Sequence, residues 1–135
     1  MRLPLLMAGI FLCACSRKPA ASGNSSEKNQ QRFERQLLNP APATITDVRY
    51  DEDLFGDPAY FLAFRCSAAD ADHIITGKNF IKGAPLITSG FRPKWWKLSE
   101  LGVGPVTYNH ETKRSIESLW VNEDKTHCYY VFWGL

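Results

Sequence analysis

The sequence has few of the residues and patterns that mark an enzyme or a metal site. Its three histidines have no partner at metal-ligand spacing, and it has neither G-x-S-x-G nor a phosphate-binding glycine loop. A formal net charge of +2 gives no basic excess for nucleic acid. The sequence therefore predicts a non-enzymatic protein with no cofactor, no metal and no nucleic-acid partner.

Long apolar runs are also missing, except at the N-terminus. Residues 3–12 are apolar apart from Pro4 and Gly9, and follow Arg2. Ten residues are too few to span a bilayer, which takes about 20, but they suit the apolar region of a signal peptide. We expect residues 1–14 to be a signal peptide.

The residues after this run carry a family resemblance. Leu12, Ala14 and Cys15 stand at −3, −1 and +1 of a cleavage site, with Cys13 at −2. This resembles the lipobox of bacterial lipoprotein precursors. The resemblance implies export, cleavage before Cys15, a diacylglyceryl thioether on Cys15 and fatty acylation, such as with palmitate, of the new amino terminus.

The resemblance also implies a membrane partner and a location. The protein would be lipid-anchored in the cell envelope, in the outer membrane facing the periplasm or the surface if the cell is Gram-negative. The alternatives are an ordinary signal peptide with a chance cysteine, or an uncleaved N-terminal anchor.

Export bears on the two cysteines that remain. Cys13 leaves with the signal peptide and Cys15 takes lipid, so Cys66 and Cys128 are left. Disulfides persist outside the cytoplasm, and an even number of cysteines favours pairing. We expect a Cys66–Cys128 disulfide; the alternative is two free, buried thiols that pack as small apolar residues.

The mature chain divides into a linker and one domain. Residues 16–31 have no aromatic and no branched aliphatic side chain, which is typical of a disordered tether. Residues 15–39 are therefore a lipidated polar linker, helical at its end if Phe33, Leu37 and Leu38 form one apolar face. Residues 40–135 are the globular domain.

Alternation predicts an α+β fold for this domain. We expect a small antiparallel sheet of four or five strands, with a C-terminal β-meander and one or two short helices. The expected strands are residues 44–50, 59–66, 105–110, 114–121 and 126–133, and the last should lie beside 59–66. Residues 68–76 should form a helix between Ser67 and Gly77. Residues 78–104 look irregular.

The irregular segment holds the best binding candidate. Lys94, Trp95, Trp96 and Lys97 place two large aromatic rings between cations. Adjacent tryptophans on a loop are typical of a protein-binding hot spot, and they can also stack on the sugars of an envelope polymer. The alternative is that one tryptophan covers the open face of the sheet.

These observations favour an envelope lipoprotein that acts as a binding or accessory module. One alternative is an enzyme, or an enzyme subunit, with a site assembled from distant residues such as His110 and His127. Another is a structural spacer without a ligand.

Overall fold

A computed structural model describes residues 26–88 and 90–135 of the chain. The expected signal peptide and the lipidation site Cys15 lie outside these residues. Nine elements follow one another in the described chain: α2 (Glu27–Gln36), β2 (Thr46–Asp53), β3 (Ala59–Arg65), α3 (Ala68–Gly77), β4 (Ile81–Lys82), the 3-10 helix η3 (Leu98–Leu101), β5 (Val106–Glu111), β6 (Ser115–Val121) and β7 (His127–Gly134).

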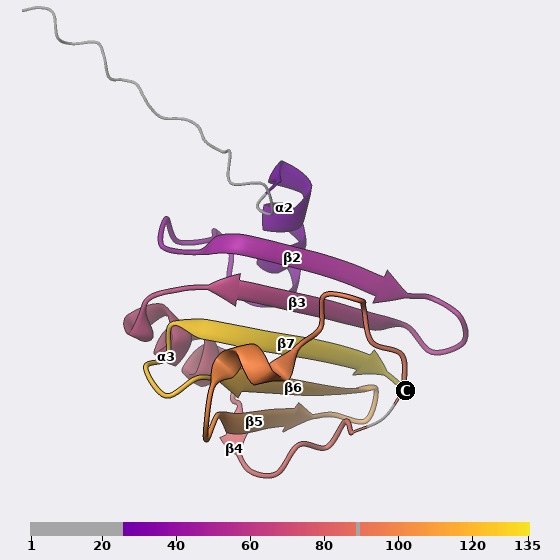
Figure 1. Cartoon of the computed structure of the whole chain (residues 1–135). Helices are drawn as coiled ribbons and strands as arrows, with labels where there is room; N and C mark the ends of the chain where they lie inside the picture. The colour runs from indigo at the N-terminus through magenta and orange to yellow at the C-terminus, as the bar shows by residue number, and fades with distance from the viewer. Residues whose placement is uncertain (1–25, 89) are drawn as a thin grey trace, which may run out of the picture.

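The strands form one antiparallel sheet in the order β2-β3-β7-β6-β5-β4 (Figure 1). The predicted α+β fold and its C-terminal meander, β5-β6-β7, are confirmed. The sheet has six strands rather than the four or five expected. The additional strand is β4, which pairs only Ile81 and Lys82 with β5 and is too short to leave an alternation signal.

The centre of the sheet lies where the sequence is apolar on both sides. β3 pairs with β7 along its whole length, with Leu62 opposite Tyr130 and Ala63 opposite Tyr129, as predicted. All four side chains are buried. Successive residues of a strand point to opposite faces, so a strand that is buried on both faces needs a cover on each side.

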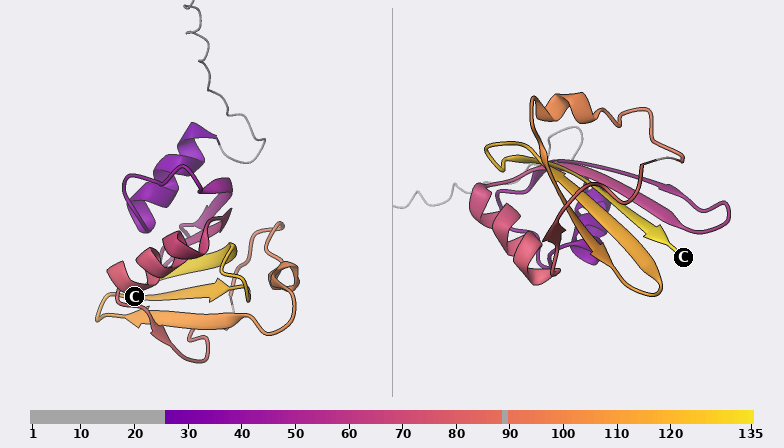
Figure 2. Two further views of the ribbon diagram at one scale, coloured as in Figure 1. Left: turned by 90° about the vertical axis from the view of Figure 1, so that its left-hand side faces the viewer. Right: turned by 90° about the horizontal axis from the view of Figure 1, so that it is seen from below.

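Helices α2 and α3 cover one face (Figure 2). The Ser67 hydroxyl caps α3 by accepting a hydrogen bond from the Asp70 amide at 3.1 Å, as the sequence predicted. Helix α2 lies within the segment 15–39 that the sequence assigns to the linker. Its Phe33 and Leu37 are nevertheless buried in the core of this face, and burying a phenylalanine stabilises a fold by about 2 kcal/mol. The packed unit therefore includes α2.

The opposite face is covered by an irregular segment instead of helices. Residues 90–104, here called the cap segment, include η3 and run across the sheet on the side away from α2 and α3 (Figure 2). They enclose a second apolar cluster that includes Phe61, Ala63, Trp120 and Tyr129. The long irregular stretch of the sequence thus acts as the second cover of the sheet.

Candidate functional site

Trp95 and Trp96 lie in the cap segment with their rings against the sheet. The Trp96 ring makes edge-to-face contacts with Tyr129, Trp120 and Phe61, with ring centroids 4.9, 5.6 and 5.7 Å away. The Trp95 ring lies 6.0 Å from that of Trp96. Both tryptophans are half-buried. Their rings therefore hold the cap segment on the sheet, which was the alternative that the sequence left open for one of them.

The two lysines that flank the tryptophans behave differently. Lys94 and Lys97 are exposed on the outer side of the cap segment. Of the four predicted binding residues, the structure thus presents the two cations to solvent and packs the two aromatic rings inward.

A polar cluster fixes the cap segment beside the tryptophans. The Tyr129 hydroxyl donates a hydrogen bond to Glu100 Oε1 at 2.6 Å, and Arg49 Nη1 lies 3.8 Å from the same oxygen. Burial and the Glu100 carboxylate together raise the pKa of Tyr129 to about 12, while the Tyr129 hydroxyl lowers the pKa of Glu100. This cluster joins η3 to β7 and β2.

His110 and His127, the residues named for a catalytic alternative, lie on opposite faces of the sheet. The His110 ring packs against Phe80 on the helix side, at a centroid distance of 6.3 Å, whereas the His127 ring packs against Tyr129 under the cap segment, at 5.5 Å. Burial lowers the pKa of His127. Within residues 26–88 and 90–135, moreover, no three His, Cys, Asp or Glu side chains are grouped to hold a metal.

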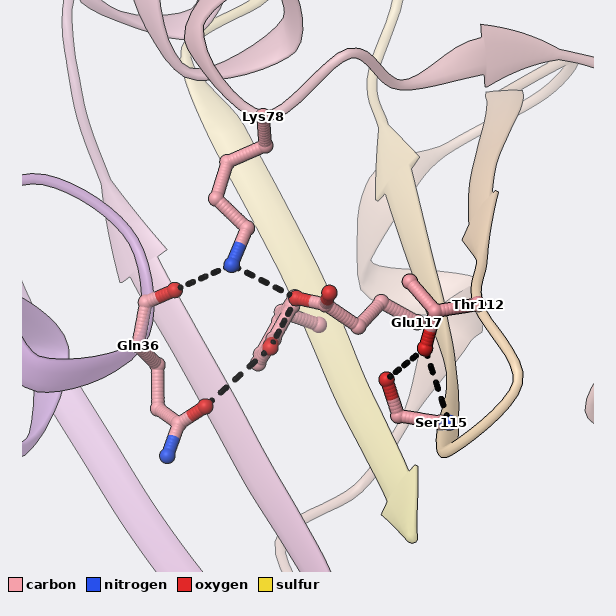
Figure 3. A network of polar contacts seen from close by, with 6 residues as sticks. Gln36, Lys78, Thr112, Ser115 and Glu117 are labelled. Carbon is pink, nitrogen blue, oxygen red and sulfur yellow. Dashed lines mark hydrogen bonds and ion pairs between the residues drawn. The ribbon is translucent and has the colours of Figure 1, made fainter. Parts of the chain in front are cut away.

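A buried ion pair on the helix side has no counterpart in the sequence predictions. Glu117 of β6 is only 4% exposed, and its Oε1 lies 2.9 Å from Lys78 Nζ at the end of α3. The same oxygen accepts a hydrogen bond from the Tyr130 hydroxyl at 2.6 Å. Lys78 Nζ also donates to the Gln36 carbonyl at 3.0 Å, so the network links the C-terminal ends of both helices to the sheet (Figure 3).

This network joins the ends of α2 and α3 to β6 and β7. Burial and the neighbouring Glu117 carboxylate raise the pKa of Tyr130 well above its usual value. The only sign of this network in the sequence is Glu117, the single charged residue of an apolar strand. A charge that is buried in such a strand needs a partner. The sequence could indicate that a partner exists but not that it is Lys78.

Cys66 and Cys128 meet on the helix side, as the predicted pairing of their strands requires. Both are free thiols in the structure, with their sulfur atoms 3.9 Å apart. The expected disulfide is not formed in the structure and stays a prediction.

The tip of the β2–β3 hairpin is an exposed apolar feature that sequence reasoning missed. Phe55 is 94% exposed and its neighbour Leu54 is also exposed. The Phe55 amide donates to Asp53 Oδ1 at 3.1 Å, and Gly56 takes a φ of +75°, so the turn has a defined shape. Acidic residues flank the two apolar residues in the sequence: Asp51, Glu52, Asp53 and Asp57.

An open groove lies at the other edge of the sheet, beside β4 and the end of β5. Its volume is about 630 Å³, and its walls include Ile81, Leu86, His110 and Glu111. Asn109, in the same wall, already donates to the Ala84 carbonyl and accepts from the Ser118 hydroxyl. Ile81 is well exposed, so this part of the groove is open to water.

Comparisons with protein-family models, with curated proteins and with solved structures give no match to this chain. No helix within the described ranges has the length and apolar character needed to cross a membrane.

Proposed function

We propose that this chain is a lipid-anchored, non-enzymatic binding module of the bacterial cell envelope, attached through Cys15. The lipobox-like residues Leu12, Ala14 and Cys15 support the anchor. A tether of ten residues, 16–25, then leads to Ser26, where the described fold begins. Such a tether holds a folded domain close to the membrane while leaving its far surfaces free to meet a partner.

The observation that carries the binding proposal is the tip of the β2–β3 hairpin. A phenylalanine that is 94% exposed makes almost no contribution to the fold, yet Phe55 lies in the turn between β2 and β3, which are paired up to Asp53 and Ala59. Aromatic side chains that are presented in this way act as anchors when they enter a pocket of a partner. Asp51, Asp53 and Asp57 lie near Phe55 in the sequence, and their negative charges favour a pocket with a basic rim.

The partner is therefore a protein with an apolar pocket lined at its edge by lysine or arginine. The cap segment offers a second contact surface through Lys94 and Lys97, which would favour an acidic partner or an envelope polymer instead. The two surfaces differ in charge, so one experiment distinguishes them.

The experiment places a photo-cross-linking benzoylphenylalanine at position 55 of the full chain in its native envelope. A matched control carries the same group at position 103, because Val103 is 96% exposed and the link between η3 and β5 lies at the opposite end of the sheet (Figure 1). We expect a protein adduct at position 55 and none at position 103. The adduct should map to an apolar site flanked by basic residues.

A charge variant completes the test with the purified partner. Asp51→Asn/Asp57→Asn keeps the size of both side chains and removes two charges from the tip. We expect weaker binding and a smaller effect of salt on the dissociation constant. Absence of any adduct at position 55, or an adduct to an acidic surface, would refute this contact surface and leave Lys94 and Lys97 to be tested by Lys→Ser variants.

The anchor is tested separately with Cys15→Ser. We expect the wild-type chain to incorporate radiolabelled palmitate and to sediment with membranes, and the variant to do neither. A wild-type chain without label would contradict the lipid anchor but not the hairpin surface.

A further inference from the structure

The two buried cysteines occupy unequal positions. Cys66 follows the last residue of β3 and precedes Ser67, the N-cap of α3, while Cys128 lies within β7. They are 62 positions apart in the chain, yet their sulfur atoms are 3.9 Å apart. Cys66 is 8% exposed and Cys128 is 0% exposed, so a reagent from solvent meets Cys66 first.

The electrostatic surroundings add to this asymmetry. The two thiols are in contact, and this contact lowers the pKa of Cys66 against the opposing effects of burial and Asp70. The Cys66 thiol also donates to the Lys125 carbonyl at 3.5 Å. Burial and the same contact raise the pKa of Cys128. The N-terminal end of α3, which has ten residues, also favours a thiolate next to it. One sulfur is thus suited to be a nucleophile and the other to remain protonated beside it.

We propose that Cys66 and Cys128 form an exchange-active dithiol, in which Cys66 attacks an exogenous disulfide and Cys128 resolves the product. The inference rests on the placement of the two sulfur atoms and is independent of the binding surface proposed above.

The exchange has two balanced steps. The Cys66 thiolate attacks one sulfur of a disulfide R–S–S–R, so that a bond from Cys66 to R–S forms and R–S⁻ leaves. The Cys128 thiol then loses its proton and attacks the Cys66 sulfur, which releases the second R–S⁻. The chain loses two electrons and gains an internal disulfide, while R–S–S–R is reduced to two thiols.

The position of Cys66 allows the second step. A disulfide bond is about 2 Å long, so the two sulfur atoms must approach each other. The Cys66 amide still bonds to the Thr126 carbonyl at 3.0 Å, but the chain leaves the sheet immediately afterwards. Cys66 lies just past Arg65–His127, the last pair between β3 and β7, so the chain can shift here to bring its sulfur toward Cys128 while the pairs of β7 with β3 are kept.

The test uses residues 16–135, which contain every described residue and only these two cysteines. The probe is oxidised glutathione, and the products are followed by intact mass after acid quenching. We expect the wild-type chain to lose two hydrogens and form the internal disulfide. Cys128→Ser should stop at a single glutathione adduct on Cys66, because nothing resolves it.

The matched control is Cys66→Ser, which retains only the buried thiol. We expect its adduct to form at least about tenfold more slowly than that of Cys128→Ser, following the difference in thiolate character and access. Circular dichroism checks that both variants fold.

A second measurement does not depend on the variants. Brief alkylation of the reduced wild-type chain with iodoacetamide, followed by peptide mapping, should label Cys66 before Cys128. A wild-type chain that keeps two thiols in oxidised glutathione would overturn the proposal. Faster labelling of Cys128 than of Cys66 would overturn it as well.

Discussion

Replacing Lys78 with methionine removes the cation from the buried network while keeping most of the side chain's apolar length. In the wild-type protein Lys78 Nζ lies 2.9 Å from Glu117 Oε1, and the side chains are 28% and 5% exposed. The variant leaves the Glu117 carboxylate buried, with the Tyr130 hydroxyl as its remaining partner in the network. The variant should therefore lose stability through an uncompensated buried charge.

The size of the effect follows from burial. Removing one partner of a buried ion pair costs about 3–5 kcal/mol, and the partial exposure of Lys78 places this site at the lower end, at about 3 kcal/mol. The exposed pair of Lys125 Nζ and Asp72 Oδ1 is a matched control, because its distance of 2.8 Å is almost the same while its side chains are 40% and 55% exposed. Lys125→Met should cost far less, since water screens that pair.

Urea unfolding at neutral pH, followed by tryptophan fluorescence, gives the free energy of unfolding of each variant. Lys78→Met/Glu117→Gln completes a double-mutant cycle and should recover about 2 kcal/mol relative to the sum of the single changes. Equal losses in Lys78→Met and Lys125→Met would refute the argument that burial sets the strength of the pair. So would strictly additive changes in the cycle.

Four further outcomes follow from the structure. Trp96→Ala should lower the free energy of unfolding by about 3 kcal/mol in the same urea assay, because its ring fills the cluster under the cap segment; a loss below a few tenths would show that the ring is not packed there. Phe55→Ser should leave that free energy within about 0.5 kcal/mol of wild type, because Phe55 is almost fully exposed. Tyr129 should ionise near pH 12 when tyrosinate absorbance is followed. Because its pKa is raised from 10.0 on folding, its contribution to stability is complete below pH 10 and is lost as the pH rises toward 12. Ionisation near pH 10 would contradict the burial of Tyr129 and its hydrogen bond to Glu100. Closing the Cys66–Cys128 bond should stabilise the oxidised chain by up to roughly 4 kcal/mol over the reduced chain, because the bond closes a long loop. Parallel denaturation curves of the two forms measure this difference, and a less stable oxidised chain would indicate that the bond distorts the core.

The sequence determined the parts of this protein that depend on neighbouring residues. Alternation in residues 59–66 and 126–133 marked strands that are apolar on both faces, and these are β3 and β7, which are neighbours in the interior of the sheet. Ser67 marked the N-terminal end of α3, whereas Gly77, expected just after the helix, is its last residue and Lys78 is the C-cap. Such signals are local, because the side-chain period of a strand and the capping of a helix need only a few consecutive residues. The pairing of β3 with β7 then placed Cys66 and Cys128 on one face.

Only the tertiary structure decided what depends on the path of the chain in space. An irregular segment has no period, so the sequence offered a tryptophan over the open face of the sheet only as an alternative and did not indicate that Trp96 would lie on Tyr129 and Trp120. The two histidines proposed for a distant site fell on opposite faces of the sheet, and Lys78 met Glu117 across 39 positions of sequence. The local sequence indicates which strand faces must be buried and which buried charges need a partner. The packing of the whole chain decides which residues bury those faces and pair with those charges, because burial depends on all elements together.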